Sequence, residues 1–171
     1  MKKLTLALTL ALLLALAVGT GVANASHSDQ GNSTGPPQDF AVGGGKHTDP
    51  ANPGVAIQFA FSAHSGPLGE DPKGTIQLFF PEGVVHAKVT CVIVEDNQAF
   101  ITGLSDELDG GIVVVHAVDN GEPSDGTPDL ARGSFAPFIV ESTEQPGCFL
   151  PVLPPVPVTQ GNIVVHDGQP M

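Results

Sequence analysis

The sequence contains neither Trp nor Tyr, and its nine aromatic residues are all Phe. Surfaces that bind sugars or peptides usually present an aromatic ring with a polar edge. Phenylalanine lacks that edge and is better suited to filling a core. The composition therefore disfavours a lectin-like role.

Basic residues are also scarce. Six Lys and Arg stand against 18 Asp and Glu, which gives a formal net charge of −12. A surface of this sign repels phosphate backbones and anionic lipid headgroups. We therefore expect no nucleic-acid partner and no electrostatic docking on a membrane.

Motifs of hydrolytic and redox enzymes are missing as well: the chain has no CxxC, GxSxG, HExxH or SxxK. Asp106, Glu107 and Asp109 offer two carboxylates for glycoside hydrolysis, but that chemistry normally needs a deep cleft with aromatic walls. The sequence predicts a protein that is not an enzyme.

What is present begins with an export signal over Met1–Ala25. Two lysines precede the apolar run Leu4–Val18, and an Ala-Asn-Ala site follows, so cleavage is expected before Ser26. The run has about 15 residues, fewer than the ~20 that span a bilayer. We expect a secreted bacterial protein without a membrane span after signal cleavage. The polar segment Ser26–Asp39 is predicted to be a disordered leader.

Residues 40–171 are predicted to form a single β-domain around the segment Val84–Val94. The odd-numbered positions of this segment are all apolar, a period of two that is typical of a strand with one face in a core. They are Val85, Ala87, Val89, Cys91 and Ile93. The even-numbered positions also become apolar at Val92 and Val94, which predicts that this end is covered on both faces.

Further strands are expected on both sides of this segment, and no segment outside the signal shows a helical apolar stripe. They are Phe40–Val42, Val55–Ala63, Thr75–Phe80, Gln98–Thr102, Ile112–Asp119, Ser134–Val140 and Asn162–His166. Gly43–Gly45 is predicted to be a turn or bulge, and Pro137 demotes its strand to a sheet edge. The Pro-rich segment 146–159 is predicted to be extended coil. The fold class is all-β: an antiparallel sandwich or a partly open barrel of about seven to eight short strands.

The two cysteines, Cys91 and Cys148, are expected to form a disulfide, as pairs in exported chains most often do. The loop that they close contains roughly 58 residues and is worth at most about 4 kcal/mol in the loop-entropy account.

A set of short motifs gives the chain a resemblance. In chain order they are Gly43–Gly45, Phe59–Ala63, Val89–Cys91 with Val94, Val118–Pro123, Pro128-Asp129 and Gly161–Asp167. Together they resemble a family of small secreted bacterial β-proteins and related post-COAP-1-type extracellular modules. The resemblance implies a β-fold over nearly the whole mature chain. It implies no catalytic residue.

The richest group of polar residues lies in Asp119–Asp129 (DNGEPSDGTPD). Its candidate oxygen ligands for calcium, which takes six to eight oxygens, are Asp119, Asn120, Glu122, Asp125 and Asp129. The spacing is not that of an EF-hand, and a solvated loop between strands is the alternative.

Three histidines share a Val-His context and all lie on expected strands: His86, His116 and His166. If these strands were neighbours in register, the three imidazoles would form a zinc site with an open position. Three outward polar residues on a sheet explain them equally well.

The sequence thus favours a secreted, non-catalytic β-domain that acts as a structural or binding module. The expected partner is an extracellular protein or surface component. The alternatives are a calcium-binding adhesion-type module using Asp119–Asp129 and a zinc enzyme using the three histidines.

Overall fold

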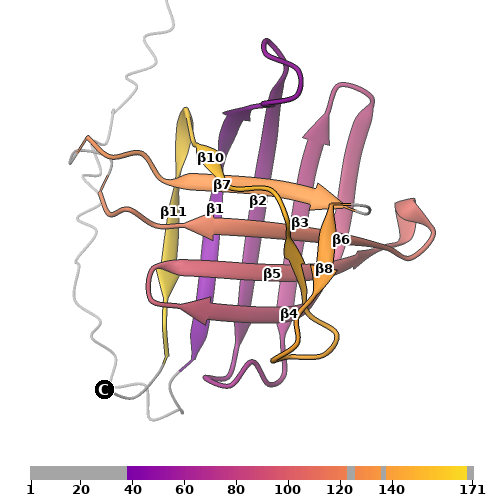
Figure 1. Cartoon of the computed structure of the whole chain (residues 1–171), viewed down its shortest axis with the longest axis vertical. Helices are drawn as coiled ribbons and strands as arrows, with labels where there is room; N and C mark the ends of the chain where they lie inside the picture. The colour runs from indigo at the N-terminus through magenta and orange to yellow at the C-terminus, as the bar shows by residue number, and fades with distance from the viewer. Residues whose placement is uncertain (1–37, 123–125, 136–137, 169–171) are drawn as a thin grey trace, which may run out of the picture. The chain divides into compact units, whose positions relative to one another are not determined.

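The computed structural model describes residues 38–122, 126–135 and 138–168 (Figure 1). The expected signal and almost all of the leader therefore lie outside the described residues, as do Asp125 and Pro137. The described residues are all-β apart from one 3₁₀ turn, and the strands outnumber the seven to eight expected. In chain order the elements are β1 (Asp39–Thr48), β2 (Ala56–Ser65), β3 (Lys73–Phe80), β4 (Gly83–Glu95), β5 (Gln98–Ser105), η1 (Asp106–Leu108), β6 (Gly111–Val118), β7 (Leu130–Phe135), β8 (Ile139–Glu141), β9 (Phe149–Pro151), β10 (Val156–Pro157) and β11 (Gln160–His166).

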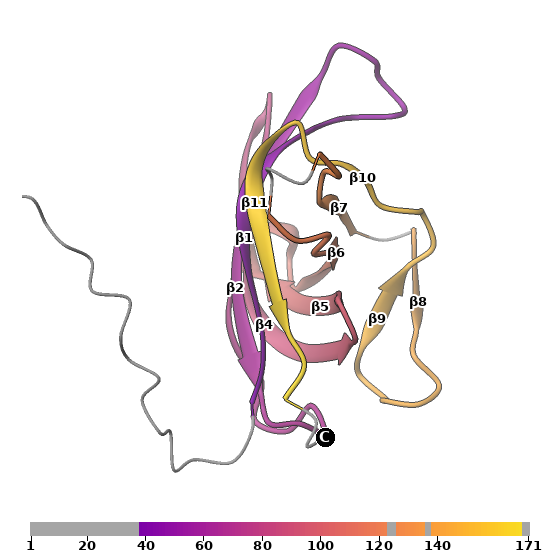
Figure 2. The ribbon, with the colours of Figure 1, turned by 90° about the vertical axis from the view of Figure 1, so that its left-hand side faces the viewer.

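Nine strands form one antiparallel sheet in the order β10-β7-β6-β5-β4-β3-β2-β1-β11, and β8 pairs with β9 in a separate small sheet. The large sheet curls into a half-barrel. Figure 1 shows β5–β7 running across β1–β3 and β11, and Figure 2 shows the two sets as facing layers. Of the two expected architectures, the partly open barrel describes this sheet.

Strand β4 belongs to both layers, because it pairs with β3 at its start and with β5 at its end. A β-bulge interrupts its pairing with β5 between Val89 and Cys91. Such an insertion bends a strand and increases its twist. The bulge therefore makes the corner at which the sheet turns from one layer into the other.

The same bulge overturns part of the predicted pattern of β4. Before it, Ala87 and Val89 belong to the core cluster; after it, Val92 and Val94 do. One extra residue reverses which side chains face inward. Cys91 and Ile93 were expected on the core face. After the bulge they alternate with the core residues Val92 and Val94, so they lie on the other face of β4.

The core lies between the two layers. Phe59, Phe61, Ile76 and Leu78 come from β2 and β3, and they are buried with valine and isoleucine side chains of β4–β6. Burial at about 25 cal/mol per Å² of apolar surface is the main stabilising contribution here.

Gly43–Gly45, expected as a turn, instead forms the middle of β1 and pairs on both sides. A Cβ at Gly43 would lie 2.8 Å from the Phe61 ring, so glycine makes room for a large core side chain. Gly43 and Gly45 therefore mark close packing, and none of the three glycines makes a change of direction.

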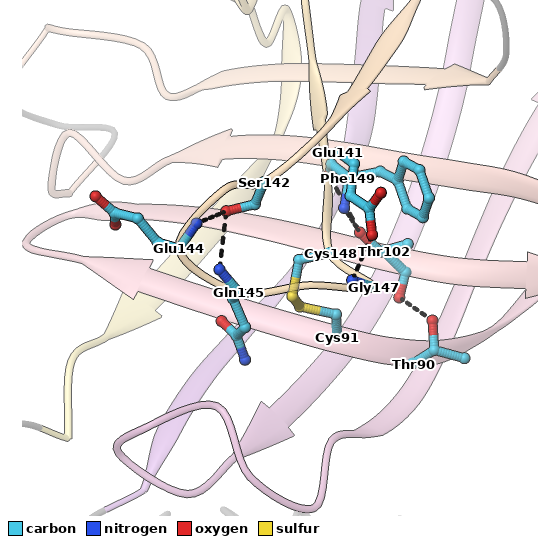
Figure 3. The surroundings of a disulfide bond; sticks show 10 residues. All are labelled: Thr90, Cys91, Thr102, Glu141, Ser142, Glu144, Gln145, Gly147, Cys148 and Phe149. Atoms are coloured by element: carbon cyan, nitrogen blue, oxygen red, sulfur yellow. Dashed lines mark hydrogen bonds between the residues drawn. A yellow bond between two sulfur atoms is a disulfide. The ribbon is translucent and has the colours of Figure 1, made fainter.

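The small sheet β8–β9 forms a third layer on the outside of β4–β6 (Figure 2). The expected disulfide, Cys91–Cys148, is confirmed and joins this hairpin to β4, with 5.4 Å between the two Cα atoms. Beside it, the Thr102 hydroxyl donates to the Phe149 carbonyl and accepts from the Phe149 amide, at 3.1 and 2.8 Å (Figure 3). The hairpin supplies the second cover predicted for the end of β4, and it explains why Val114, on the outer face of β6, is fully buried.

Two predictions in the C-terminal third were wrong. The strand expected at Ser134–Val140 is replaced by β7, which begins four residues earlier, and by β8, which pairs with β9. The Pro-rich segment is not only coil, because it contributes β9 and β10. Proline is tolerated there since both strands are short and lie at sheet edges.

Candidate functional site

The loop that was the candidate calcium site joins β6 to β7, and two of its aspartates, Asp119 and Asp129, hold the edge strand β11. Asp129 accepts hydrogen bonds from the Asn120 amide at 2.9 Å and the Ile163 amide at 2.7 Å. Asp119 accepts from the Gly121 amide at 2.8 Å and the Val165 amide at 3.0 Å. All four carboxylate oxygens are thus engaged by main-chain donors.

The other candidate ligands do not complete a calcium site. The Asn120 side chain donates to the Pro128 carbonyl at 2.7 Å, Glu122 is exposed, and Asp125 lies outside the described residues. Within the described ranges, no three His, Cys, Asp or Glu side chains are grouped closely enough to hold a metal ion. Within the described residues, the carboxylates of Asp119 and Asp129 therefore have a structural role.

The three histidines have separate surroundings. His86 lies beside Glu107, with 3.1 Å between Nδ1 and Oε1. His116 stacks on Phe100 at 4.4 Å between ring centroids, and His166 stacks on Phe40 at 5.0 Å. β5 lies between the strands of His86 and His116, and β11 is at the far edge of the sheet. The structure does not bring the three imidazoles together, and the zinc interpretation has no geometric basis.

Glu107, one of the carboxylates considered for hydrolysis, is in the 3₁₀ turn η1. The Ser105 hydroxyl donates to it at 2.9 Å. This bond, followed by weaker contributions that include His86, lowers the pKa of Glu107. Ser105 is buried and its proton is directed at a carboxylate rather than at a histidine, so the group does not have the arrangement of an activated nucleophile.

A different site appears where the edges of the curled sheet approach each other. Along this line, which we call the seam, the first half of β7 pairs with β10, but no described strand pairs with Arg132–Phe135 on the side away from β6. A pocket of about 540 Å³ lies there. We call it the seam pocket; it is lined by Asp49, Pro50, Ala51, Ile57, Arg132, Gly133, Ser134, Phe135, Phe138, Leu153, Pro154 and Val156.

The walls of the seam pocket are mostly apolar, and they come from four parts of the chain. These are the turn after β1 with the start of β2, the strand β7, Phe138 before β8, and the segment that leads into β10. Its volume falls within the range of about 300–1,000 Å³ that is typical of small-molecule sites. The exposed rings of Phe135 and Phe138 extend the apolar surface at this place.

Three polar residues line the seam pocket. Asp49 accepts from the Ala51 amide at 2.9 Å and from Asn52 Nδ2 at 2.8 Å, and these bonds, Asn52 first, lower its pKa. Arg132 makes no hydrogen bond or ion pair with any other described residue. Ser134 is 6 % exposed, and its hydroxyl has no partner in the described part of the chain. Of these three residues, only Asp49 therefore has a side chain that is hydrogen-bonded to other described residues.

Sequence reasoning missed this site because its walls are distant in the chain. One signal was available: Arg132 is the single arginine of the sequence. The apolar residues of 149–156 were assigned to a coil, so no function was attached to them.

No described helix is long and apolar enough to cross a membrane. Comparisons with known proteins give no match among family models, curated proteins or solved structures.

Proposed function

We propose that this chain is an exported, non-catalytic binding module that holds a small, largely apolar molecule in the seam pocket. The observation that carries the proposal is the pocket itself: about 540 Å³, mostly apolar walls, and two polar groups, Arg132 and Ser134, that have no partner among the described residues. Pockets of this kind bind ligands by burying apolar surface, and a few polar groups set the orientation.

Export is supported by the signal pattern of Met1–Ala25 and by the disulfide, since disulfides persist in oxidising compartments. The resemblance to post-COAP-1-type extracellular modules agrees with this location. The proposal includes no chemistry, because Asp119 and Asp129 accept main-chain amides and Glu107 accepts from Ser105.

The proposal is tested by titrating the protein with Nile red, a neutral dye that fluoresces in apolar surroundings. We expect saturable binding of one dye per chain. Leu153→Ala should weaken binding by roughly 5- to 30-fold, as expected for the loss of about 1–2 kcal/mol of apolar contact.

Leu68→Ala is the matched control, because Leu68 is 82 % exposed and is not part of the pocket wall. Unsaturable binding, or an equal response of the two leucine variants, would show that the dye does not report on the seam pocket and would reject the function.

A further inference from the structure

Arg132 stands out among the residues of the seam pocket. It is the one arginine of a chain with a formal net charge of −12, yet no described carboxylate forms an ion pair with it. A guanidinium is permanently charged and presents five N–H donors in a planar fork. These donors lie beside a mostly apolar pocket, so the pocket has one charged group whose hydrogen bonds are open to a ligand.

The neighbours of Arg132 form no ion pair with it. Asp49 faces the same pocket; hydrogen bonds from Asn52 and Ala51 in its own turn, followed by the nearby charge of Arg132, lower its pKa, but no ion pair joins the two side chains. His116 is opposite Arg132 in the pairing of β6 with β7. Its Nε2 lies 3.0 Å from the Gln98 side-chain oxygen, and burial lowers its pKa, which favours the neutral ring. Among the described residues, the positive charge of Arg132 is therefore without an ion-pair partner.

Ser134 adds a second polar group on the same face of β7, because residues two apart in a strand point to the same side. A buried hydroxyl without a partner is unfavourable and calls for an explanation. A serine hydroxyl changes position by a single χ1 rotation, so a group held at Arg132 can also bind Ser134.

From this juxtaposition we infer that the seam pocket binds a small carboxylic acid with an apolar body, whose carboxylate pairs with Arg132 and reaches the Ser134 hydroxyl. The inference rests on the proposed function and adds the ligand class. Paired N–H donors of arginine match the two oxygens of a carboxylate and form its strongest hydrogen bonds. The acidic surface opposes anions, so such a ligand depends on this local cation and on burial of its apolar body.

The experiment is calorimetric titration of the full mature chain with decanoate, and with 1-decanol as the neutral counterpart of similar length. Wild type should bind decanoate more tightly than decanol. Arg132→Gln should weaken decanoate by at least about 10-fold and leave decanol within about 2-fold. Lys88→Gln is the control for charge, because it removes one exposed cation outside the seam pocket. It should change neither ligand by more than about 2-fold.

Ser134→Ala separates a ligand role from a structural one. The variant removes an unpaired buried hydroxyl, so its melting temperature should equal or exceed that of wild type, while decanoate affinity falls by about 3- to 10-fold. Should Arg132→Gln fold poorly, Arg132→Lys keeps the charge and loses the planar fork. It should then give an affinity between wild type and decanol.

The outcomes distinguish the two proposals. Equal binding of decanoate and decanol, with neither affected by Arg132→Gln, would reject the carboxylate inference and leave the apolar pocket in place. Absence of binding by both ligands, together with unsaturable Nile red, would reject the pocket function itself.

Discussion

The two parts of the seam differ in how the exposed edge of a strand is treated. At β11, the outward amides of Ile163 and Val165 are bound by Asp129 and Asp119. At β7, the stretch Arg132–Phe135 has no strand beside it on that side among the described residues, and a pocket takes the place of a partner. One part of the seam is closed by side chains and the other is open.

The difference shows the structural role of Asp119 and Asp129. An edge strand presents unpaired donors that other chains can bind, and proteins usually cover or block such edges. Here two carboxylates do so while the sheet remains a half-barrel. The residues that looked most like a functional site therefore close the fold, and the seam pocket lies along the part of the edge that these two carboxylates do not cover.

The largest effect is expected at the hairpin that covers the outer layer. Replacing Cys91 and Cys148 with Ala should lower the free energy of unfolding by up to about 4 kcal/mol, because the cross-link closes a long loop in the unfolded chain. It should also weaken Nile red binding, since the chain after β9 carries Leu153 and Pro154 to the pocket. Urea unfolding measures the first effect and dye titration the second. If the variant without the disulfide bound Nile red as tightly as wild type, the open part of the seam would form independently of the disulfide.

The closed part of the seam is broken most directly at Asp129. Asp129→Ala removes the acceptor of two main-chain amides and should cost about 3 kcal/mol, given about 1.5–3 kcal/mol for each hydrogen bond to a charged group and partial replacement by water. Urea unfolding again provides the measurement. Asp109→Ala serves as the comparison in an exposed turn, although its left-handed backbone, with φ of 51°, adds a small cost of its own. If Asp129→Ala proved no worse than Asp109→Ala, the carboxylate would not close the seam.

The smallest effect is on the pH dependence of stability. Burial lowers the pKa of His47 and of His116 from 6.5. Unfolded histidine then binds a proton at a higher pH than the folded one does, so this stability is complete above about pH 6.5 and is lost as the pH falls toward the folded values. His47→Phe should make the decline below pH 6.5 shallower, as followed by melting temperature across a pH series.

Asp39 acts in the opposite direction. Burial, the main cause, raises its pKa from 3.8, so its contribution favours the folded state at low pH and is lost as the pH rises through the folded value. Its window begins at the ordinary value of 3.8 and extends upward from there. Asp39→Asn should remove it while keeping an acceptor for the Gly168 amide, which lies 2.7 Å from Oδ1 in wild type. An unchanged profile in both variants would mean that neither buried group contributes to the pH dependence.

How far the sequence predicts this protein is seen best in β4. The alternation correctly placed Ala87 and Val89 inside, and the apolar end correctly indicated a second cover. It failed at Cys91, where the bulge shifts the alternation by one residue. The run that follows is apolar at every position, so it fits a core face in either phase and the sequence does not reveal the shift. Similarly, Asp119 and Asp129 were recognised as a group of carboxylates, but whether a carboxylate binds a cation or an amide depends on what the fold places opposite it.

The sequence alone determined the β class, most strand positions and the pairing of the two cysteines, because these follow from local alternation, turn residues and simple counting. Tertiary structure decided the rest: the curl of the sheet, the corner in β4, the aspartates that hold β11 and the pocket around Arg132. All of these depend on groups that are distant in the chain and become neighbours only when the sheet closes toward itself. The spacing of residues along the chain does not predict which of these distant groups come into contact.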